Sequence, residues 1–375
     1  MRLLRGPILG LSLAALLAGL WGALSFLGLP AEPPARFAAD HGPLMALGFL
    51  GTVISLERAV ALGRSWSYGA PLAAALGAAA IVAGLPAGLG PLFLTAGAVI
   101  LVATYVELFR IEPRVHVGVQ ALGAAAWLVA GLLWLAGQTV PSLVPWFAAF
   151  LVLTIVGERL ELSRLRRLSP RAGRAFVVLI VATMSGTLVS ILAPDLGTRL
   201  SGLAYCGLAA WLLTNDLARR TVRLPGVTRF IAWSLLSGFA WLAVAGLLWL
   251  AGGAADGPLY DARLHAVFLG FVISMVFGHA PVIVPAVLGL DLPYRPRFHA
   301  HLALLHVGLV VRLVGGDLLG NPSALQAGGV LNELALLLFL ASSASAVLQA
   351  RRVWRPASWT SEDGAARIGR TETMT

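Results

Sequence analysis

Four histidines lie in stretches of this sequence that are long and apolar enough to cross a membrane: His41, His265, His279 and His306. An ionisable side chain inside a bilayer is costly and is usually retained for a function. A neutral imidazole can ligate a haem iron or a metal ion. These histidines are therefore the first candidates for cofactor ligands.

His265 and His279 share the apolar stretch from Arg263 to Gly289. They are fourteen residues apart, which in an α-helix places them about 40° apart around the axis and about 21 Å apart along it. Two side chains separated in this way cannot bind the same small metal centre. If both are ligands, they belong to two sites at different depths in the membrane.

The composition predicts an all-α, polytopic membrane protein in contact with the lipid bilayer. Of 375 residues, 58% are hydrophobic and 12% are charged, and the mean hydropathy is +0.86. The single cysteine excludes a disulfide framework and a cysteine-based zinc site. Twelve transmembrane helices are expected, at about 7–29, 41–63, 70–88, 91–109, 116–137, 142–160, 174–193, 198–217, 229–251, 260–288, 298–318 and 325–349.

The arginines predict the orientation of these spans. With a cytoplasmic N-terminus, 23 of the 27 arginines fall on the cytoplasmic side, Arg36, Arg199 and Arg263 fall outside, and Arg312 lies within a span. This asymmetry predicts cytoplasmic N- and C-termini and a location in the inner (cytoplasmic) membrane. Because the charges lie between apolar segments, the net charge of +10 does not indicate a nucleic-acid partner. The first span could be a signal peptide, but its length favours an uncleaved helix.

An internal repeat divides the expected spans into three groups. The sequence AGLLWLAG occurs at 130–137 and again at 245–252, an offset of four spans. We therefore expect one transmembrane domain over 1–355, with four-helix units at 1–114, 115–228 and 229–355 in a pseudo-threefold arrangement. Chance similarity between helices rich in Leu, Ala and Gly remains the alternative. Residues 356–375 are polar and are expected to form a disordered cytoplasmic tail.

His41 and His265 are expected at the same depth, in the outer third of the second and tenth spans. Each is followed by a Gly-Phe dipeptide, which ends in Phe49 and Phe271 respectively. Glycine would let a flat macrocycle approach the backbone, and phenylalanine could pack on its face. The pattern predicts that His41 and His265 are axial ligands of a haem. The alternative is that each histidine only forms a hydrogen bond with a neighbouring helix.

Two arginines are expected near the propionates of such a haem, at its outer edge. They are Arg263, at the start of the tenth span, and Arg312, in the eleventh. Glu333 or Asp317 could instead neutralise Arg312.

A second site is conceivable in the inner half, where His279 and His306 are expected at nearly the same depth. Together they could ligate a second haem or a metal ion such as copper. His299 and His301 are expected at the membrane interface, near lipid headgroups.

The start of the second span, His41-Gly-Pro-Leu-Met45, with the histidines of the tenth, resembles the catalytic subunit of haem–copper oxidases and nitric oxide reductases. The run from His265 to His279 is more similar to NnrS, a family of twelve-span haem- and copper-containing proteins linked to the bacterial response to nitric oxide. Both resemblances imply a low-spin haem b held by His41 and His265. The oxidase copper site is not expected, because spans 142–160 and 174–193 contain no histidine.

The leading hypothesis is a b-type haem protein that acts in nitric oxide or oxygen response or in electron transfer, and not as a proton-pumping oxidase. NO or O2 would be its gaseous ligand, and a redox protein or an oxidase subunit its partner. Whether the chain is an enzyme is left open, and no catalytic residue is assigned. One alternative is a twelve-span secondary transporter without a cofactor. Another is an assembly factor for respiratory complexes.

Overall fold

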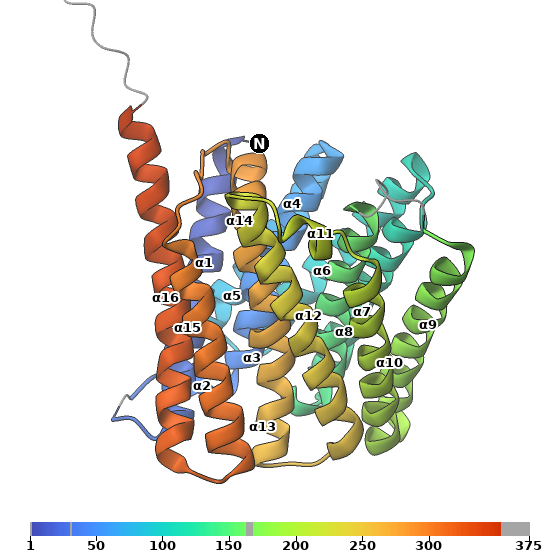
Figure 1. The fold of residues 1–375 in the computed structure, drawn as a ribbon, viewed down its shortest axis with the longest axis vertical. Coiled ribbons are helices and arrows are strands. Elements are labelled where there is room, and N and C mark those ends of the chain that lie inside the picture. Colours follow the sequence, from blue (N-terminus) through green and yellow to red (C-terminus); the bar gives the residue numbers. More distant parts are fainter. Residues whose placement is uncertain (1, 31, 163–167, 354–375) are drawn as a thin grey trace, which may run out of the picture.

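The computed structural model describes residues 2–30, 32–162 and 168–353, and this part of the chain is built from helices (Figure 1). Eleven of these helical segments are long and apolar enough to cross a membrane. The chain is therefore an all-α, multi-pass membrane protein. The polar tail predicted at 356–375 lies outside the described residues.

The helices follow one another through short connections. The α-helices are α1 (Arg2–Leu24), α2 (Ala35–Ala39), α3 (His41–Pro43), α4 (Thr52–Leu62), α5 (Gly69–Ala83), α6 (Leu89–Ile111), α7 (Val115–Leu135), α8 (Val140–Leu162), α9 (Pro170–Leu192), α10 (Pro194–Asn215), α11 (Ala218–Thr221), α12 (Val227–Gly252), α13 (Pro258–His265), α14 (Ser274–Leu288), α15 (Phe298–Val310) and α16 (Pro322–Val353). Short 3-10 helices lie at η1 (Ser25–Leu27) and η3 (Ser65–Tyr68).

The expected eighth span corresponds to α10, which does not meet the apolar criterion among the described helices. Asp195 and Arg199 in its first turns, and Asn215 at its end, lower its mean hydropathy. It is nevertheless 22 residues long and packs lengthwise between α9 and α12. Counting α10 as a span, which brings the total to twelve, therefore rests on its packing against its neighbours and not on its composition.

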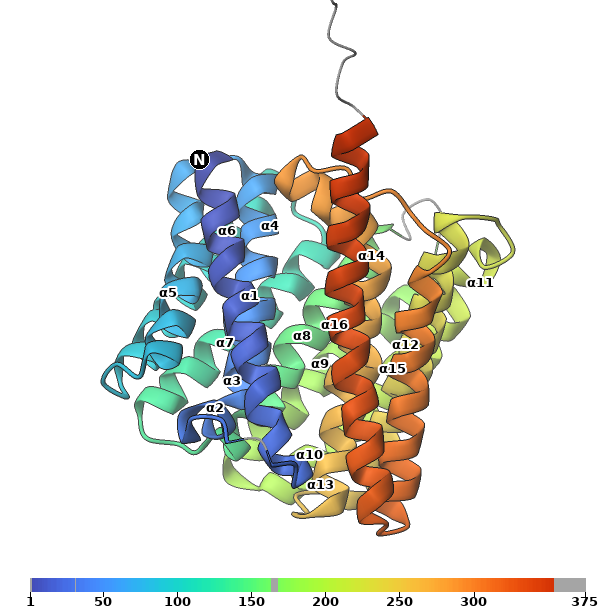
Figure 2. The ribbon, with the colours of Figure 1, turned by 90° about the vertical axis from the view of Figure 1, so that its left-hand side faces the viewer.

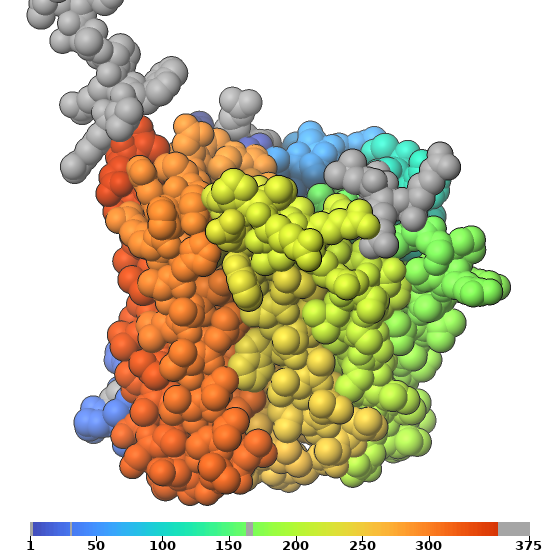
Figure 3. Space-filling view, viewed as in Figure 1, coloured from blue at the N-terminus to red at the C-terminus, as the bar shows by residue number. Residues whose placement is uncertain are grey.

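Helices adjacent in sequence pack against each other, and α8 lies at the centre. It is the most buried of the candidate spans and contacts both α7 and α9. On one face, α12 lies between α10 and α15 (Figure 3). Large apolar side chains such as Leu203, Leu247 and Val307 are exposed on the surface, as contact with lipid requires. The chain enters α1 and leaves α16 at the same end of the molecule, called here the termini end (Figures 1 and 2).

Three spans contain a π-helical segment: η2 (Leu44–Gly51), η5 (Ala266–Ile273) and η6 (Val311–Leu318). Segments of this kind are rare in proteins overall, and those that occur often lie at functional sites. The first two have the same design. The hydroxyl group of Thr52 donates to the carbonyl oxygen of Gly48 at 2.7 Å, and that of Ser274 donates to Gly270 at 2.6 Å. Through these bonds, the carbonyl groups gain a hydrogen-bond donor where the regular α-helical pattern of main-chain hydrogen bonds is interrupted. Both η2 and η5 contact the central helix α8.

The grouping of the spans into three four-helix units stays a prediction. The described contacts join successive helices across the expected boundaries at 114/115 and 228/229 as well as within the units. For example, α6 packs along α7, and α10 along α12.

Candidate functional site

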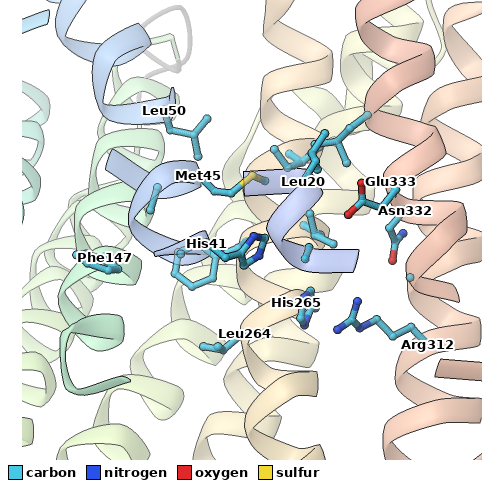
Figure 4. A pocket seen from close by; sticks show the side chains of 18 of the residues that line it. Leu20, His41, Met45, Leu50, Phe147, Leu264, His265, Arg312, Asn332 and Glu333 are labelled. Atoms are coloured by element: carbon cyan, nitrogen blue, oxygen red, sulfur yellow. The ribbon is translucent and has the colours of Figure 1, made fainter. Parts of the chain in front are cut away.

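A cavity of about 130 Å³ lies in the half of the molecule away from the termini end. It is lined by His41 before η2, by His265 before η5 and by Arg312 within η6, so each π-helical segment contributes or adjoins one polar lining residue. Figure 4 shows these three side chains directed toward a common space between different helices. Most of the remaining wall is apolar and includes Leu20, Leu27, Met45, Phe147, Phe268 and Leu336.

Each of these two histidines has one ring nitrogen fixed by a main-chain carbonyl group. Nδ1 of His41 lies 2.7 Å from the carbonyl oxygen of Gly19, and Nδ1 of His265 lies 2.8 Å from that of Asp261. A carbonyl oxygen only accepts hydrogen bonds, so Nδ1 carries the proton in both rings. Nε2 then keeps its lone pair, and neither Nε2 atom has a hydrogen-bond partner among the described residues. A donor on one ring nitrogen is the usual way in which a protein orients a ligating imidazole.

Just outside the span, the residue before His41 adjoins this region. Asp40 is partly buried, and burial raises the pKa of its carboxyl group.

Arg312 forms an ion pair with Asp261 and not with Glu333 or Asp317, the partners considered from the sequence. Its Nη2 lies 2.8 and 3.1 Å from the two carboxylate oxygens, and its Nε lies 3.1 Å from Oδ2. The same carboxylate also lies 3.3 Å from Nδ1 of His265. Nη1 of Arg312 has no hydrogen-bond partner in the described part of the chain. Glu333, one helix away, lines the same cavity.

Arg263 does not face the cavity, which corrects the expectation that it would pair with a propionate there. Its guanidinium group lies 4.9 Å from the ring centre of Tyr260 and 5.6 Å from that of Trp249. It precedes His265 by two residues, and two residues correspond to about 200° around an α-helix. The two side chains therefore point to opposite sides of α13.

The Gly-Phe dipeptides serve helix packing, which corrects the expectation that they would cradle a flat macrocycle. A Cβ atom on Gly48 would lie 2.9 Å from the Cβ of Ala78, and one on Gly270 would lie 2.6 Å from the Trp241 side chain. Phe49 lines a different cavity, and Phe271 is fully buried and lines neither cavity described here. Phe147 and Phe268 supply the aromatic wall instead.

His279 and His306 have separate partners, which argues against the second site expected between them. Nε2 of His279 lies 3.5 Å from Nη1 of Arg159, and its Nδ1 lies 2.7 Å from the carbonyl oxygen of Met275. The indole N–H of Trp241 donates to Nδ1 of His306 at 3.0 Å. His279 lines a second cavity, and His306 is absent from that wall.

His301 is fully buried, so its expected contact with lipid headgroups is wrong. The rings of Phe230, Phe277, Phe298 and Phe339 surround it, with centroids 4.6–5.9 Å from the imidazole. His299, two residues earlier, is more exposed and lies near Tyr294.

The sequence spacing of two further residues relates them to the histidines of the site. Asp261 precedes His265 by four residues and Met45 follows His41 by four, so each pair shares one helix face. Within the described ranges, no three His, Cys, Asp or Glu side chains are grouped as a metal ion would require. Two imidazoles are too few for a typical zinc or copper centre. They suit a haem iron, because the macrocycle itself supplies the other four ligands.

Comparisons with known proteins yield a family but no named relative. No curated protein and no solved structure matches the chain. One family model matches residues 5–348, which is most of the chain. The chain therefore belongs to the family described as "Domain of unknown function (DUF8744)".

Proposed function

We propose that the chain is a membrane-bound b-type haem protein in which His41 and His265 are the axial ligands. One observation carries the proposal: two imidazoles from different spans line the same cavity, each with Nδ1 held by a carbonyl oxygen. Both Nε2 atoms are thereby kept in the neutral, ligating form. Such tautomer control is typical of haem and metal ligands.

The residues around the cavity suit a haem chemically, but the cavity must widen to hold one. The cavity of about 130 Å³ is smaller than the roughly 300 Å³ or more of most ligand sites. Leu20, Met45 and Phe268 in its wall have rotatable side chains that would have to make room. Nη1 of Arg312 is available to a propionate while Asp261 holds the rest of the guanidinium group.

A bound haem b would supply a one-electron redox centre. Because His41 and His265 would both hold the haem, we place electron transfer ahead of the binding of NO or O2. A membrane or soluble redox protein, or an oxidase subunit, would then be the partner. The similarity to NnrS and the arginine asymmetry extend this proposal to a role in nitric oxide response, in the cytoplasmic membrane with cytoplasmic termini.

The test is the visible absorption spectrum of the purified full-length protein after expression with sufficient haem. We expect a Soret band in the wild type and in His279→Ala and His306→Ala, which remove histidines from outside the cavity. The band should be lost in His41→Ala and His265→Ala. Size-exclusion elution at the wild-type volume establishes that each variant is folded, and added imidazole should restore the band in His41→Gly and His265→Gly. A folded wild type without a Soret band would refute the proposal.

The second candidate function is a secondary transporter, and one observation favours it. The cavity at His41 and the second cavity at His279 lie at different depths and share Leu50 in their walls. Two cavities separated by a thin wall are what alternating access would need. The two candidates differ in one measurement, because a transporter without a cofactor has no spectrum that His265→Ala could change.

A further inference from the structure

The second cavity, of about 470 Å³, lies in the half of the molecule at the termini end. It is bounded by α1, α4, α8, α14 and α16, and most of its wall is apolar. One side is open, because Leu348 of α16 lines the cavity and is 57% exposed. In Figure 2, α1 and α16 lie next to one another on the face toward the viewer, and α14 lies behind α16. A molecule dissolved in the bilayer could therefore enter between α1 and α16.

Three ionisable side chains meet at the inner wall of this cavity. Glu57 comes from α4, Glu158 from α8 and His279 from α14. These helices contact each other through η2 and η5 or directly, so the three groups converge from different parts of the sequence. Burying them in a membrane protein is costly, which makes the wall a candidate binding surface.

The arginines next to this cluster do not line the cavity, and only Arg58 pairs with its glutamates. Arg58 pairs with Glu57 and lies 3.7 Å from Glu158. Arg159 is held by Asp216, with contacts of 2.8 and 3.0 Å. Neither arginine lines the cavity.

The cavity therefore presents hydrogen-bond acceptors to a ligand. The glutamates provide carboxyl oxygens, and His279 offers no free N–H group, since its Nδ1 proton is used by the carbonyl group of Met275. On the opposite side, Oγ of Ser343 is buried without a hydrogen-bond partner in the described chain and lines the same space. Among the described residues, Arg351, at the exposed end of α16, is the one cation in the lining.

We propose that this cavity binds an uncharged, lipid-soluble molecule whose head carries a hydroxyl group. The hydroxyl group donates to Glu57 or Glu158, and the apolar tail lies along α1 and α16 toward the lipid. A carboxylate or phosphate head is disfavoured, because it would meet two partly buried glutamates while Arg58, their partner, does not line the cavity. Two sources share this chemistry: an isoprenoid quinol, and a long-chain alcohol or acylglycerol. The inference does not depend on haem binding at the other cavity.

The experiment uses two photoactivatable probes of equal chain length, a long-chain alcohol and the matching fatty acid, with the full-length protein in lipid nanodiscs. Mass spectrometry locates the labelled peptides. We expect the alcohol to label α14 and α16, and the fatty acid to label them at least about tenfold less. Competition by a short-chain quinol or by a monoacylglycerol distinguishes the two sources. Equal labelling by alcohol and acid, or no labelling of the cavity helices, would overturn the proposal.

Variants separate binding from folding. Of Glu57→Gln and Glu158→Gln, the variant that removes the carboxyl group accepting from the hydroxyl group should weaken competition about tenfold, as expected for loss of a charged acceptor. Glu333→Gln, in the other cavity, is the matched control and should change nothing. Ala344→Trp fills the cavity from an exposed position of α16 and should abolish labelling without altering any charge. Unchanged labelling in Ala344→Trp, with normal size-exclusion behaviour, would also overturn the proposal.

Discussion

The ion pair between Arg312 and Asp261 should contribute about 2 kcal/mol to the free energy of unfolding. Three contacts of 2.8–3.1 Å join the two groups, and hydrogen bonds to charged partners are worth about 1.5–3 kcal/mol each. The Arg312 side chain is 9% exposed, but that of Asp261 is 33% exposed, so solvent screens part of this gain. Asp261 also supports His265 through its main-chain carbonyl group, which Asp261→Asn leaves in place.

A double-mutant cycle measures this energy. Asp261→Asn and Arg312→Gln should each destabilise the protein by about 2 kcal/mol, because each leaves the other charge unpaired in a partly buried site. The double variant should lose about 2 kcal/mol and not about 4, which gives a coupling energy of about 2 kcal/mol. The assay is equilibrium unfolding in mixtures of mild detergent and sodium dodecyl sulfate, followed by tryptophan fluorescence.

The matched control is the pair of Arg64 and Glu107, which also has a contact of 2.8 Å. There the arginine side chain is 54% exposed, so the same cycle should give a coupling energy below about 1 kcal/mol. A coupling energy for Arg312 and Asp261 as small as that of the control would refute the reasoning. It would mean that solvent or lipid headgroups compensate the pair more fully than its burial indicates.

Two further predictions concern the helix contacts. Gly270→Ala should destabilise the protein by about 1–3 kcal/mol in the same unfolding assay, because the added Cβ would lie 2.6 Å from the Trp241 side chain. The control is Gly10→Ala, whose added Cβ meets no atom within 4 Å and should leave the stability unchanged. Arg159→Gln should cost about 3–5 kcal/mol, since it leaves the carboxylate of Asp216 buried and unpaired, and a loss below 1 kcal/mol in thermal or detergent unfolding would contradict this.

The sequence could predict the helical membrane architecture, because each span must carry its own apolar surface. It could also predict that His41 and His265 lie at one depth, because the arginines orient the second and tenth spans in the same direction. The structure places both in one cavity. That they ligate a haem stays a proposal.

Contacts between helices could not be predicted in the same way. The partner of Arg312 is 51 residues away on a different helix, and spacing within one helix only suggested Asp317. Arg263 and His265 are close in sequence, but the rotation of α13 separates them. The burial of His301 depends on phenylalanines from four different helices, which periodicity along α15 does not reveal.

The angle of about 40° expected between His265 and His279 depends on the type of helix that joins them. It assumes α-helical geometry throughout, whereas η5 separates the two residues. A π-helical turn accommodates about one additional residue, which rotates the following half of the span by about 100° relative to the preceding half. The two histidines line two different cavities, as their separation of fourteen residues along the chain predicted.

The same π-helical segments have a consequence for comparing sequences within this family. A relative in which η2 or η5 is a regular α-helix would carry one residue fewer at that point. A correct alignment would then need a single-residue gap in the middle of a membrane span, where gaps are normally avoided. Without that gap, an alignment could match only one of His265 and His279 to its counterpart in the relative. The other histidine of the relative would then be overlooked, although the fold and the cavities were the same.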